Sequence, residues 1–145
     1  MDVARIAADL KRDEGVVRHA YQDSEGYWTI GCGRLIDKRK GGGLSNDEIN
    51  YLLANNITEV VVALDKALPW WRQMNEPRQE ALANMAFNLG INGLLKFKQT
   101  LSALEHGDYA RASAQMLASK WAKQVGKRAV RLAGQIATGE RVERK

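Results

Sequence analysis

The chain has 145 residues, of which 45% are hydrophobic and 27% are charged, and its net charge is +5. This length suits one domain, or one domain with a small lobe, and the composition excludes disorder as the main state. Cys32 stands alone, so the chain can form neither an intramolecular disulfide framework nor a cysteine-rich metal cluster.

The N-terminus has no apolar run of the kind that a signal peptide needs. No stretch of the sequence approaches the roughly 18 consecutive apolar residues of a membrane span. We therefore expect a protein that is made in the cytoplasm without a signal peptide and does not insert stably into a membrane.

The positive charge is concentrated near the C-terminus, where residues 120–145 contain eight Lys or Arg against two Glu. Such a segment favours a polyanionic partner, and nucleic acid, anionic lipid and an acidic cell-wall polymer are all candidates. A solvated helix face with a basic end is the alternative interpretation.

The first half of the chain predicts a helix followed by a small sheet. Apolar residues at helical spacing indicate a helix over residues 3–13 that ends at Gly15, which places Glu14 at a helix C-terminus. Residues 16–36 change to short β-rich runs with turn signals, and we predict a small antiparallel sheet there, including a strand over 27–33.

A long helix should follow the sheet. Ser45 and Glu48 form a capping box, and the helix runs to about Leu68, where Pro69 stops it. Its wide apolar stripe allows it to bury one face and to connect two lobes. Capping residues and glycine stops predict further helices over 75–89, 93–106, 108–118, 119–124 and 127–138.

Together these elements predict an α+β fold in a single domain over residues 1–145. The sheet lobe covers about 14–45, the helical lobe covers about 68–145, and the first helix packs on the helical lobe. Trp70, Trp71 and Trp121 are expected in the core rather than on a sugar-binding surface.

The residues with the clearest chemistry lie between Glu14 and Gly33. A carboxylate at a helix C-terminus faces the negative end of the helix dipole, which with partial burial would raise the pKa of Glu14 and suit a general acid. Taken singly, Glu14 could equally be an exposed helix end and Asp23 a turn residue. On the strand, the Thr29 hydroxyl alternates onto the same face as Gly31 and Gly33, which leaves an open floor for an extended ligand.

Two carboxylates beside such a floor indicate glycoside hydrolysis. The spacing of Glu14, Asp23 and Thr29, followed by Ile-Gly-Cys-Gly, resembles the active-site stretch of the phage-type lysozymes, or endolysins, of glycoside hydrolase family 24. Segments that are similar to later parts of the same family are Asn84–Gly90, Gly93–Leu101, Ser119–Trp121, Lys127–Leu132 and Thr138–Gly139.

The resemblance implies a lysozyme-like fold with a cleft between the lobes, and hydrolysis of the β-1,4 bond between N-acetylmuramic acid and N-acetylglucosamine in bacterial peptidoglycan. It implies that Glu14 protonates the glycosidic oxygen, while Asp23 and Thr29 position the attacking water or stabilise the transition state, with inversion at the anomeric carbon. Arg128 matches a family arginine that pairs with the catalytic glutamate. The saccharide contacts implied are Leu35, Phe87, Thr100 and Gln115.

We expect no metal and no cofactor, because the mechanism needs only carboxylates and water. The resemblance also implies a monomer that binds peptidoglycan, has no specific nucleic-acid partner, and leaves the host cytoplasm for the periplasm with the help of a holin during host cell lysis.

Three other functions stay open at this point. A lytic transglycosylase would cut the same substrate with one catalytic acid, although Asp23 and Thr29 argue against it. Residues 110–136 could be drawn as a basic helix-turn-helix that binds nucleic acid, which leaves residues 14–33 unexplained. The basic C-terminal segment could also disturb anionic membranes.

Overall fold

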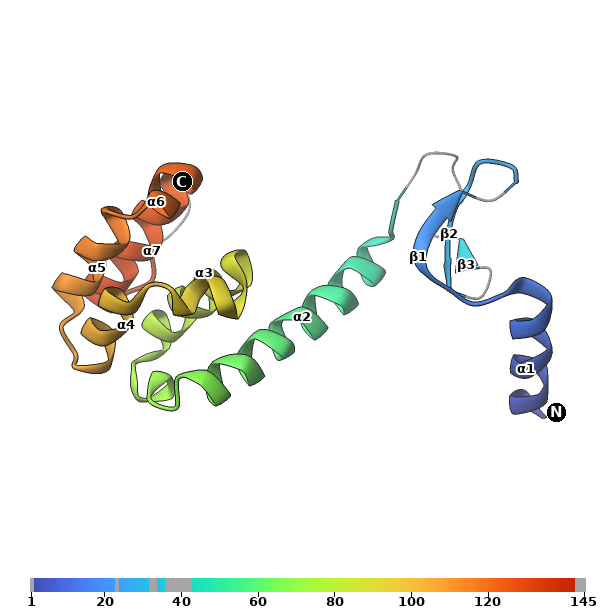
Figure 1. The fold of residues 1–145 in the computed structure, drawn as a ribbon, viewed down its shortest axis with the longest axis horizontal. Helices are drawn as coiled ribbons and strands as arrows, with labels where there is room; N and C mark the ends of the chain where they lie inside the picture. Colours follow the sequence, from blue (N-terminus) through green and yellow to red (C-terminus); the bar gives the residue numbers. More distant parts are fainter. Residues whose placement is uncertain (1, 23, 32–33, 36–42, 143–145) are drawn as a thin grey trace. The chain divides into compact units, whose positions relative to one another are not determined.

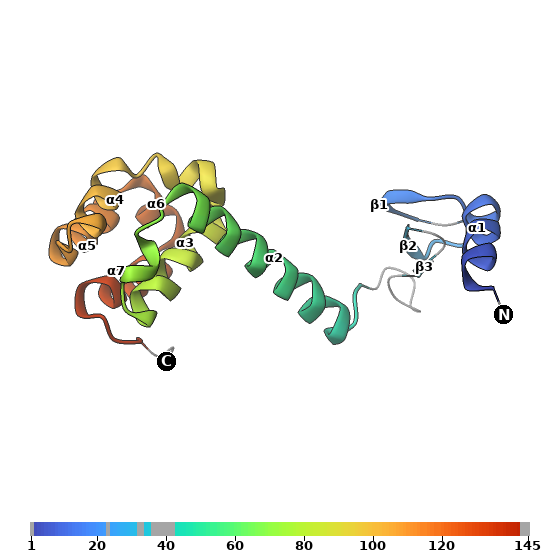
Figure 2. The same cartoon turned by 90° about the horizontal axis from the view of Figure 1, so that it is seen from below.

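The computed structural model describes residues 2–22, 24–31, 34–35 and 43–142. The chain forms two compact units, Met1–Leu53 and Ala54–Lys145. The first unit holds one helix, a small sheet and the beginning of a long helix, and the second is helical throughout (Figures 1 and 2). None of the described helices is both long and apolar enough to cross a membrane.

The first unit begins with α1 (Val3–Glu14), as the apolar spacing predicted. The Asp2 carboxylate caps this helix by accepting the backbone N–H of Arg5 at 3.1 Å. At the other end Gly15 has φ +75 and donates its N–H to the Lys11 carbonyl at 3.0 Å. A positive φ is accessible to glycine at little cost, so the helix stops directly after Glu14.

The predicted antiparallel sheet is confirmed. It has the order β1 (Val17–Gln22), β2 (Trp28–Gly31), β3 (Arg34–Leu35), and both strand pairs are antiparallel. A register shift lies between Val17 and Tyr21 on β1. The predicted strand over 27–33 is confirmed over Trp28–Gly31 and begins one residue later than expected, and residues 32–33 lie outside the described part of the chain.

The long helix α2 (Asn46–Ala67) is confirmed, and it crosses the boundary between the two units, which falls after Leu53. Its start is the predicted capping box. The Ser45 N–H donates to Glu48 Oε1 at 3.0 Å, and the Glu48 N–H donates to Ser45 Oγ at 3.2 Å. These two bonds satisfy two donors that the first turn of a helix would leave without a partner.

Asp65 holds the turn that follows α2. Its carboxylate accepts Trp71 Nε1–H at 2.7 Å and two bonds from Arg72, Nε–H at 2.6 Å and Nη2–H at 3.0 Å. The Arg72 guanidinium lies 5.1 Å from the centre of the Trp71 ring. Hydrogen bonds from Arg72 and then from Trp71 hold the pKa of Asp65 below its usual range. The short 3₁₀ helix η1 (Trp71–Gln73) is thereby fixed against the end of α2.

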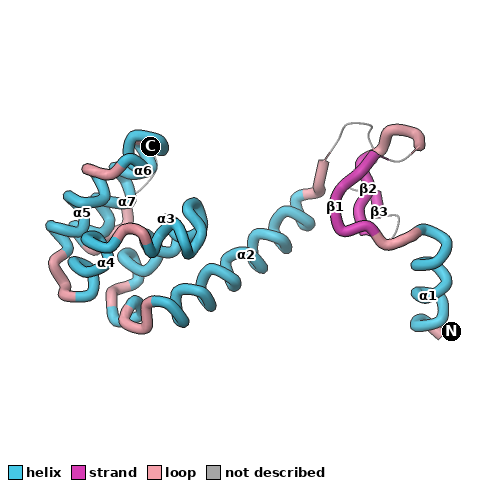
Figure 3. The backbone as a smooth tube through the Cα atoms, viewed as in Figure 1, coloured by secondary structure: helices cyan, strands magenta, loops and turns pink. Residues whose placement is uncertain are grey.

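The remaining helices are α3 (Glu76–Leu95), α4 (Lys98–Glu105), α5 (Tyr109–Leu117), α6 (Lys120–Val125) and α7 (Lys127–Thr138), drawn in cyan in Figure 3. The last three match their predicted limits to within one or two residues. Asp108 and Ser119 cap α5 and α6 with their side chains, and Gly139 ends α7 in the left-handed conformation, as predicted.

The predicted helix over 93–106 is wrong in one respect, because two helical segments meet there. Gly90 interrupts α3 with φ +73 and ψ +159, and helical geometry then resumes as far as Leu95. A second break follows at Phe97, whose ψ of +56 is not helical, and α4 begins after it. The Phe97 ring packs edge-to-face on Trp121, with 6.2 Å between the ring centres. This tertiary contact overrides the local helical pattern.

The helical unit contains the described hydrophobic core, in which α3 and α5 both pack against α7, and α4 packs against α5. Trp71 and Trp121 are buried there as predicted, whereas Trp70 is half-buried at its edge. Full burial of each large apolar side chain contributes about 1.5–3 kcal/mol. The largest fully buried side chains are Leu64, Leu82, Met85, Leu94, Leu104, Met116 and Ile136.

Arg78 ties the start of α3 to the end of α7. Its Nε–H donates to the Ile136 carbonyl at 2.7 Å and its Nη2–H to the Ala137 carbonyl at 3.3 Å, so it satisfies carbonyls that the last turn of α7 leaves free. The guanidinium carbon lies 3.6 Å from the centre of the Tyr109 ring, a cation–π contact. Beside it, Asn75 Nδ2–H donates to the Gly139 carbonyl at 2.9 Å.

Replacing Gly139 tests this junction. A Cβ at Gly139 would lie 2.8 Å from Arg78 Nη1 and 2.9 Å from Asn75 Nδ2, so both side chains would have to leave their partners. We expect Gly139→Ala to lower the free energy of unfolding by about 2 kcal/mol, measured by urea denaturation. Gly107→Ala is the control, because Gly107 has a similar φ of +75 with nothing within 4 Å, and it should cost about 1 kcal/mol. Equal losses of unfolding free energy in the two variants would show that the junction accommodates a methyl group at position 139.

The Asp65 contacts predict an acid-dependent loss of stability. Because the pKa of Asp65 is lower in the folded state, its contribution is present above the ordinary aspartate pKa of about 3.9 and is lost as the pH falls below it. Asp65→Asn should therefore have a lower urea midpoint than wild type at pH 7 and a shallower fall between about pH 5 and pH 2. Glu105→Gln is the control, since no cation among the described residues contacts Glu105. If the urea midpoints of Asp65→Asn and wild type fell in parallel as the pH was lowered, the Asp65 carboxylate would not be the source of the acid-dependent loss.

Candidate active site

The first unit holds the predicted catalytic stretch on adjoining elements. Glu14 is the last residue of α1, at the negative end of its dipole, and β1 begins three residues later. The Glu14 side chain lies outside what the structure describes, and so does Asp23, which directly follows β1. The backbone therefore puts Glu14 before β1 and Asp23 after it, and their catalytic roles stay predictions.

Thr29 lies on the central strand of the sheet. Its Cα partners are Tyr21 on β1 and Leu35 on β3, so the structure brings Thr29 next to Leu35, the first predicted saccharide contact. The Thr29 side chain is 3% exposed, and its Oγ1–H donates to the Tyr27 carbonyl at 3.1 Å. This bond fixes the hydroxyl orientation. Gly31, with φ +70, lies on the same strand, while Gly33 lies outside the described residues.

In the helical unit, two more predicted saccharide contacts line one groove. Thr100 at the start of α4 and Gln115 near the end of α5 border a space of about 390 Å³ that we call the lysine groove. Thr100 is buried and Gln115 is exposed. The complete lining is Lys96, Phe97, Lys98, Gln99, Thr100, Gln115, Ala118, Ser119, Lys120 and Trp121.

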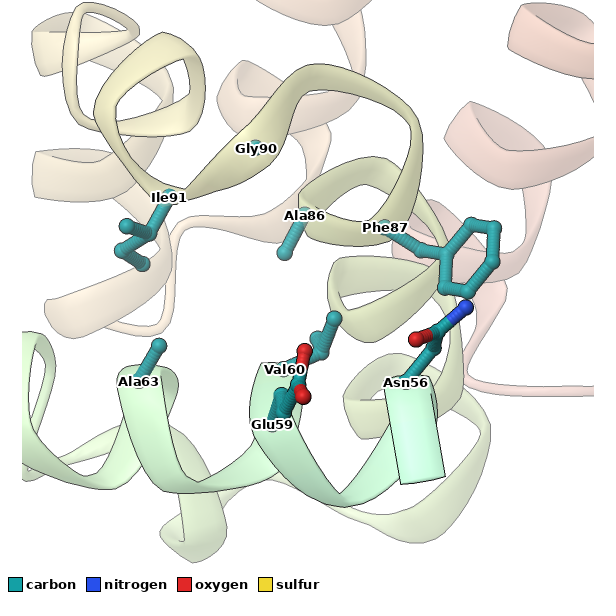
Figure 4. Close-up of a pocket in the computed structure, with 8 residues that line it drawn as sticks. All are labelled: Asn56, Glu59, Val60, Ala63, Ala86, Phe87, Gly90 and Ile91. Atoms are coloured by element: carbon teal, nitrogen blue, oxygen red, sulfur yellow. The ribbon is translucent and has the colours of Figure 1, made fainter. Parts of the chain in front are cut away.

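Phe87, the remaining predicted contact, lines a different groove of about 310 Å³ between α2 and α3. Figure 4 shows Asn56, Glu59 and Val60 on α2 facing Phe87 on α3, and the Phe87 side chain is 45% exposed. The backbone break at Gly90 borders this groove. The structure thus groups Thr100 with Gln115 and places Phe87 on a separate surface of the same unit.

Arg128 is held by an asparagine. On α7, its Nε–H and Nη2–H both donate to Asn84 Oδ1 on α3, at 2.9 and 2.7 Å. Arg128 is half-buried, and no described carboxylate forms an ion pair with it. Its charge is therefore oriented but not neutralised by the described part of the chain.

A second asparagine, Asn88, lies one helical turn further along α3 and accepts a hydrogen bond from Trp121 in the same way. Asn88 Oδ1 accepts the Trp121 Nε1–H at 2.7 Å. Residues four apart share a helix face, so Asn84 and Asn88 present two amide groups to the C-terminal helices. Neither was predicted to have a role. In the sequence, two asparagines four residues apart on one helix, next to Met85 and Ala86, which are buried, form the pattern that could have indicated these roles.

No group of three or more His, Cys, Asp or Glu that could hold a metal ion occurs in the described part of the chain. Cys32 lies outside the described residues. His106 ends α4, where its Nδ1 lies 2.7 Å from the Ser102 carbonyl oxygen.

The family model for phage lysozyme matches residues 11–138, which include every predicted site residue. The chain belongs to the phage lysozyme family. It is, on that ground, a glycoside hydrolase, and the α+β content of the described residues, with one small antiparallel sheet among many helices, agrees with this family.

Several curated relatives of this phage lysozyme family member have matching names. A probable T4-type lysozyme of Dictyostelium discoideum is 29% identical over 94% of this chain and 96% of its own length. An endolysin of Acyrthosiphon pisum secondary endosymbiont phage 1 is 29% identical over 82% of this chain and 80% of its length. The pre-baseplate central spike protein Gp5 of Enterobacteria phage T4 is 32% identical over 92% of this chain, which spans only 28% of that larger protein.

Asn84 can be tested as the residue that positions Arg128. Asn84→Ala removes both hydrogen bonds to the guanidinium, and we expect peptidoglycan cleavage to fall about five- to tenfold and the free energy of unfolding by about 1–3 kcal/mol. Asn84→Asp keeps an acceptor at the same place but adds a charge that pairs with Arg128, so it should restore the free energy of unfolding while cleavage stays low. If Asn84→Ala cleaved peptidoglycan at the wild-type rate while it remained folded, positioning of Arg128 would not be the role of Asn84.

Proposed function

We propose that this protein is an endolysin that hydrolyses the β-1,4 bond between N-acetylmuramic acid and N-acetylglucosamine in bacterial peptidoglycan. The observation that carries the proposal is the order of elements in the first unit. A glutamate ends α1, and a buried threonine lies on the central strand beside Leu35, within the stretch that the family model covers. The names of the lysozyme and endolysin relatives support the same activity.

In the proposed mechanism Glu14 is the general acid. Cleavage of a glycosidic bond needs a proton on the leaving oxygen, and a carboxyl group at the negative end of a helix keeps its proton more readily than a free one. Asp23 and Thr29 position the attacking water on the opposite face of the sugar and stabilise the oxocarbenium-like transition state. The outcome is inversion, because a water molecule and not an enzyme group attacks the anomeric carbon.

The proposed substrate cleft uses residues of both units. Leu35 would contact the glycan from the sheet, and Phe87, Thr100 and Gln115 would contact it from the helices. Arg128 would pair with Glu14, a role for which its cation is available because Asn84 provides only a neutral acceptor. In this proposal residues 1–145 form one lysozyme-like domain, and α1 packs on the helical lobe.

We also propose where the protein acts. It would accumulate as a monomer in the host cytoplasm and reach the peptidoglycan from the periplasmic side after a holin has opened the inner membrane. Peptidoglycan would be its partner, with no specific nucleic acid. The basic groups near the C-terminus then attract the negatively charged cell wall.

The proposal is tested by the products formed from purified peptidoglycan. Wild type should release muropeptides with free reducing ends, Glu14→Gln should be inactive, and Asp23→Asn should lose at least about a hundredfold in rate, since each general acid or base contributes about 10²–10⁴. The measurement is a reducing-end assay with mass analysis of the fragments. A circular dichroism comparison of the variants with wild type controls for folding.

Other products would overturn parts of the proposal. Anhydro ends would indicate a lytic transglycosylase in place of a hydrolase. A fully active Asp23→Asn would remove the water-positioning role from that residue, and a product of retained configuration would contradict inversion.

A further inference from the structure

The helical unit has a further hollow, at the end of α4 that lies away from the lysine groove. Its volume is about 260 Å³, and it lies between the turn that follows α2 and the turn that joins α4 to α5. Because α4 has eight residues, its two ends are about 12 Å apart. Two aromatic residues, Trp70 and Tyr109, and three polar ones, Gln73, Glu105 and His106, line this hollow, which we call the Trp70 pocket.

Both walls of the Trp70 pocket are held by hydrogen bonds. On one side, Gln79 Nε2–H donates to the Arg72 carbonyl at 3.0 Å and to the Met74 carbonyl at 2.6 Å, which holds the turn after α2. On the other side, Gly107 has φ +75, and its N–H donates to the Leu104 carbonyl at 3.1 Å. Met74 and Leu104 also line the pocket and are buried in the core. The pocket therefore has its shape before a ligand binds, and binding does not have to order these turns.

Four lining residues have polar groups without a hydrogen-bond partner. Gln73 and Glu105 are exposed, and no described residue bonds to their side chains. Trp70 and Tyr109 are half-buried, and the indole N–H and the phenol hydroxyl are unbonded within the described chain. Because every buried polar side-chain atom of the described residues has a partner, these two groups must be open to solvent. A ligand can bond to all four without displacing a contact of the protein.

His106 adds an acceptor whose direction is fixed. Its Nδ1 lies 2.7 Å from the Ser102 carbonyl oxygen, and a carbonyl only accepts, so Nδ1 carries the proton. In the neutral ring Nε2 is then an acceptor. With the Glu105 carboxylate, it gives the pocket two acceptors for the hydroxyl or amide N–H groups of a ligand.

The charges at the Trp70 pocket favour a neutral ligand. None of the described lining residues is Lys or Arg, and Glu105 repels an anion. A cation would meet the Arg78 guanidinium, whose carbon lies 3.6 Å from the centre of the Tyr109 ring. A sugar ring is neutral, carries several hydroxyls and has apolar C–H faces that pack on aromatic rings. Sites for drug-sized ligands measure about 300–1,000 Å³, so this smaller pocket suits a single ring.

We propose that the Trp70 pocket binds one neutral sugar ring of a glycan strand, as a saccharide site separate from the cleavage site. The binding chemistry stands on the pocket alone. The identity of the sugar rests on the proposed function, in which N-acetylglucosamine is the neutral sugar of the substrate. A second contact with the same polymer raises the effective concentration of the enzyme on it. The pocket thus retains the enzyme on insoluble peptidoglycan.

The magnetic resonance signals of the indole N–H groups test this inference. The isotope-labelled protein is titrated with chitotriose, a neutral chain of N-acetylglucosamine units, and Trp70→Phe identifies the Trp70 signal. The indoles of Trp71 and Trp121 are bonded to Asp65 and Asn88, and Trp121 lines the lysine groove. The Trp70 signal should therefore shift with saturation, independently of any change at Trp121.

Two variants establish which groups bind the sugar. Gln73→Ala and Glu105→Gln should each weaken the affinity measured at the Trp70 signal by about three- to tenfold, the value of one hydrogen bond. Glu140→Gln is the control, because Glu140 is exposed and does not line the pocket. The remaining signals of each spectrum show that the variants are folded.

Several results of the titration would overturn the inference. These are a Trp70 signal that does not move, a shift at Trp121 alone, and affinities that neither variant changes. A shift of the same size with ethylamine in place of the sugar would mean that the pocket binds cations, and it would also contradict the proposal.

Cleavage rates test the retention of the enzyme. The double variant Q73A/E105Q should lose about fivefold in initial rate on insoluble peptidoglycan and nearly nothing on soluble glycan fragments. Equal losses on both substrates, or no loss on either, would overturn the retention role while leaving the proposed function intact. A wild-type protein that cleaves neither substrate would overturn the proposed function instead, and the titration with chitotriose then decides the inference by itself.

Discussion

The contact on which the helical unit depends is the one that Arg78 makes between α3 and α7. One guanidinium satisfies two carbonyls at the end of α7 and stacks on Tyr109 at the start of α5, so three helices meet at a single side chain. Among the described residues, no other group donates a hydrogen bond to the Ile136 and Ala137 carbonyls. Because α7 also carries Arg128, this junction fixes where the Arg128 guanidinium lies along α3.

Helix α3 also orients two side chains that come from other helices. Asn84 and Asn88 project from one face of α3 and hold Arg128 and Trp121, which come from α7 and α6. Both bonds use a neutral acceptor, so they orient their partners without neutralising charge. An aspartate at position 84 would have formed an ion pair and reduced the attraction of Arg128 for another carboxylate. The choice of amide over carboxylate keeps the arginine available, and a fixed Trp121 gives the lysine groove a rigid floor.

Prediction from the sequence succeeded where one residue sets the local backbone. The reciprocal bonds of Ser45 and Glu48, the cap at Asp108 and the left-handed Gly139 each follow from side-chain chemistry within four residues. It failed at Phe97, where a contact with Trp121, 24 positions further along, breaks a pattern that is locally helical. Trp70 and Trp71 show the same limit, because composition cannot tell which of two adjacent indoles will be buried.

The sequence by itself determined the limits of α1, α2 and α5 to α7, the presence of the sheet, and membership of the phage lysozyme family, since these depend on spacing and on local caps. Only the tertiary structure decided that Asn84 holds Arg128, that Thr100 and Gln115 share a groove with three lysines, and that Phe87 lines another. These relations join residues that are tens of positions apart. Packing of the buried helix faces brings these residues together, and no pattern within a few residues of the sequence encodes a contact between positions so far apart.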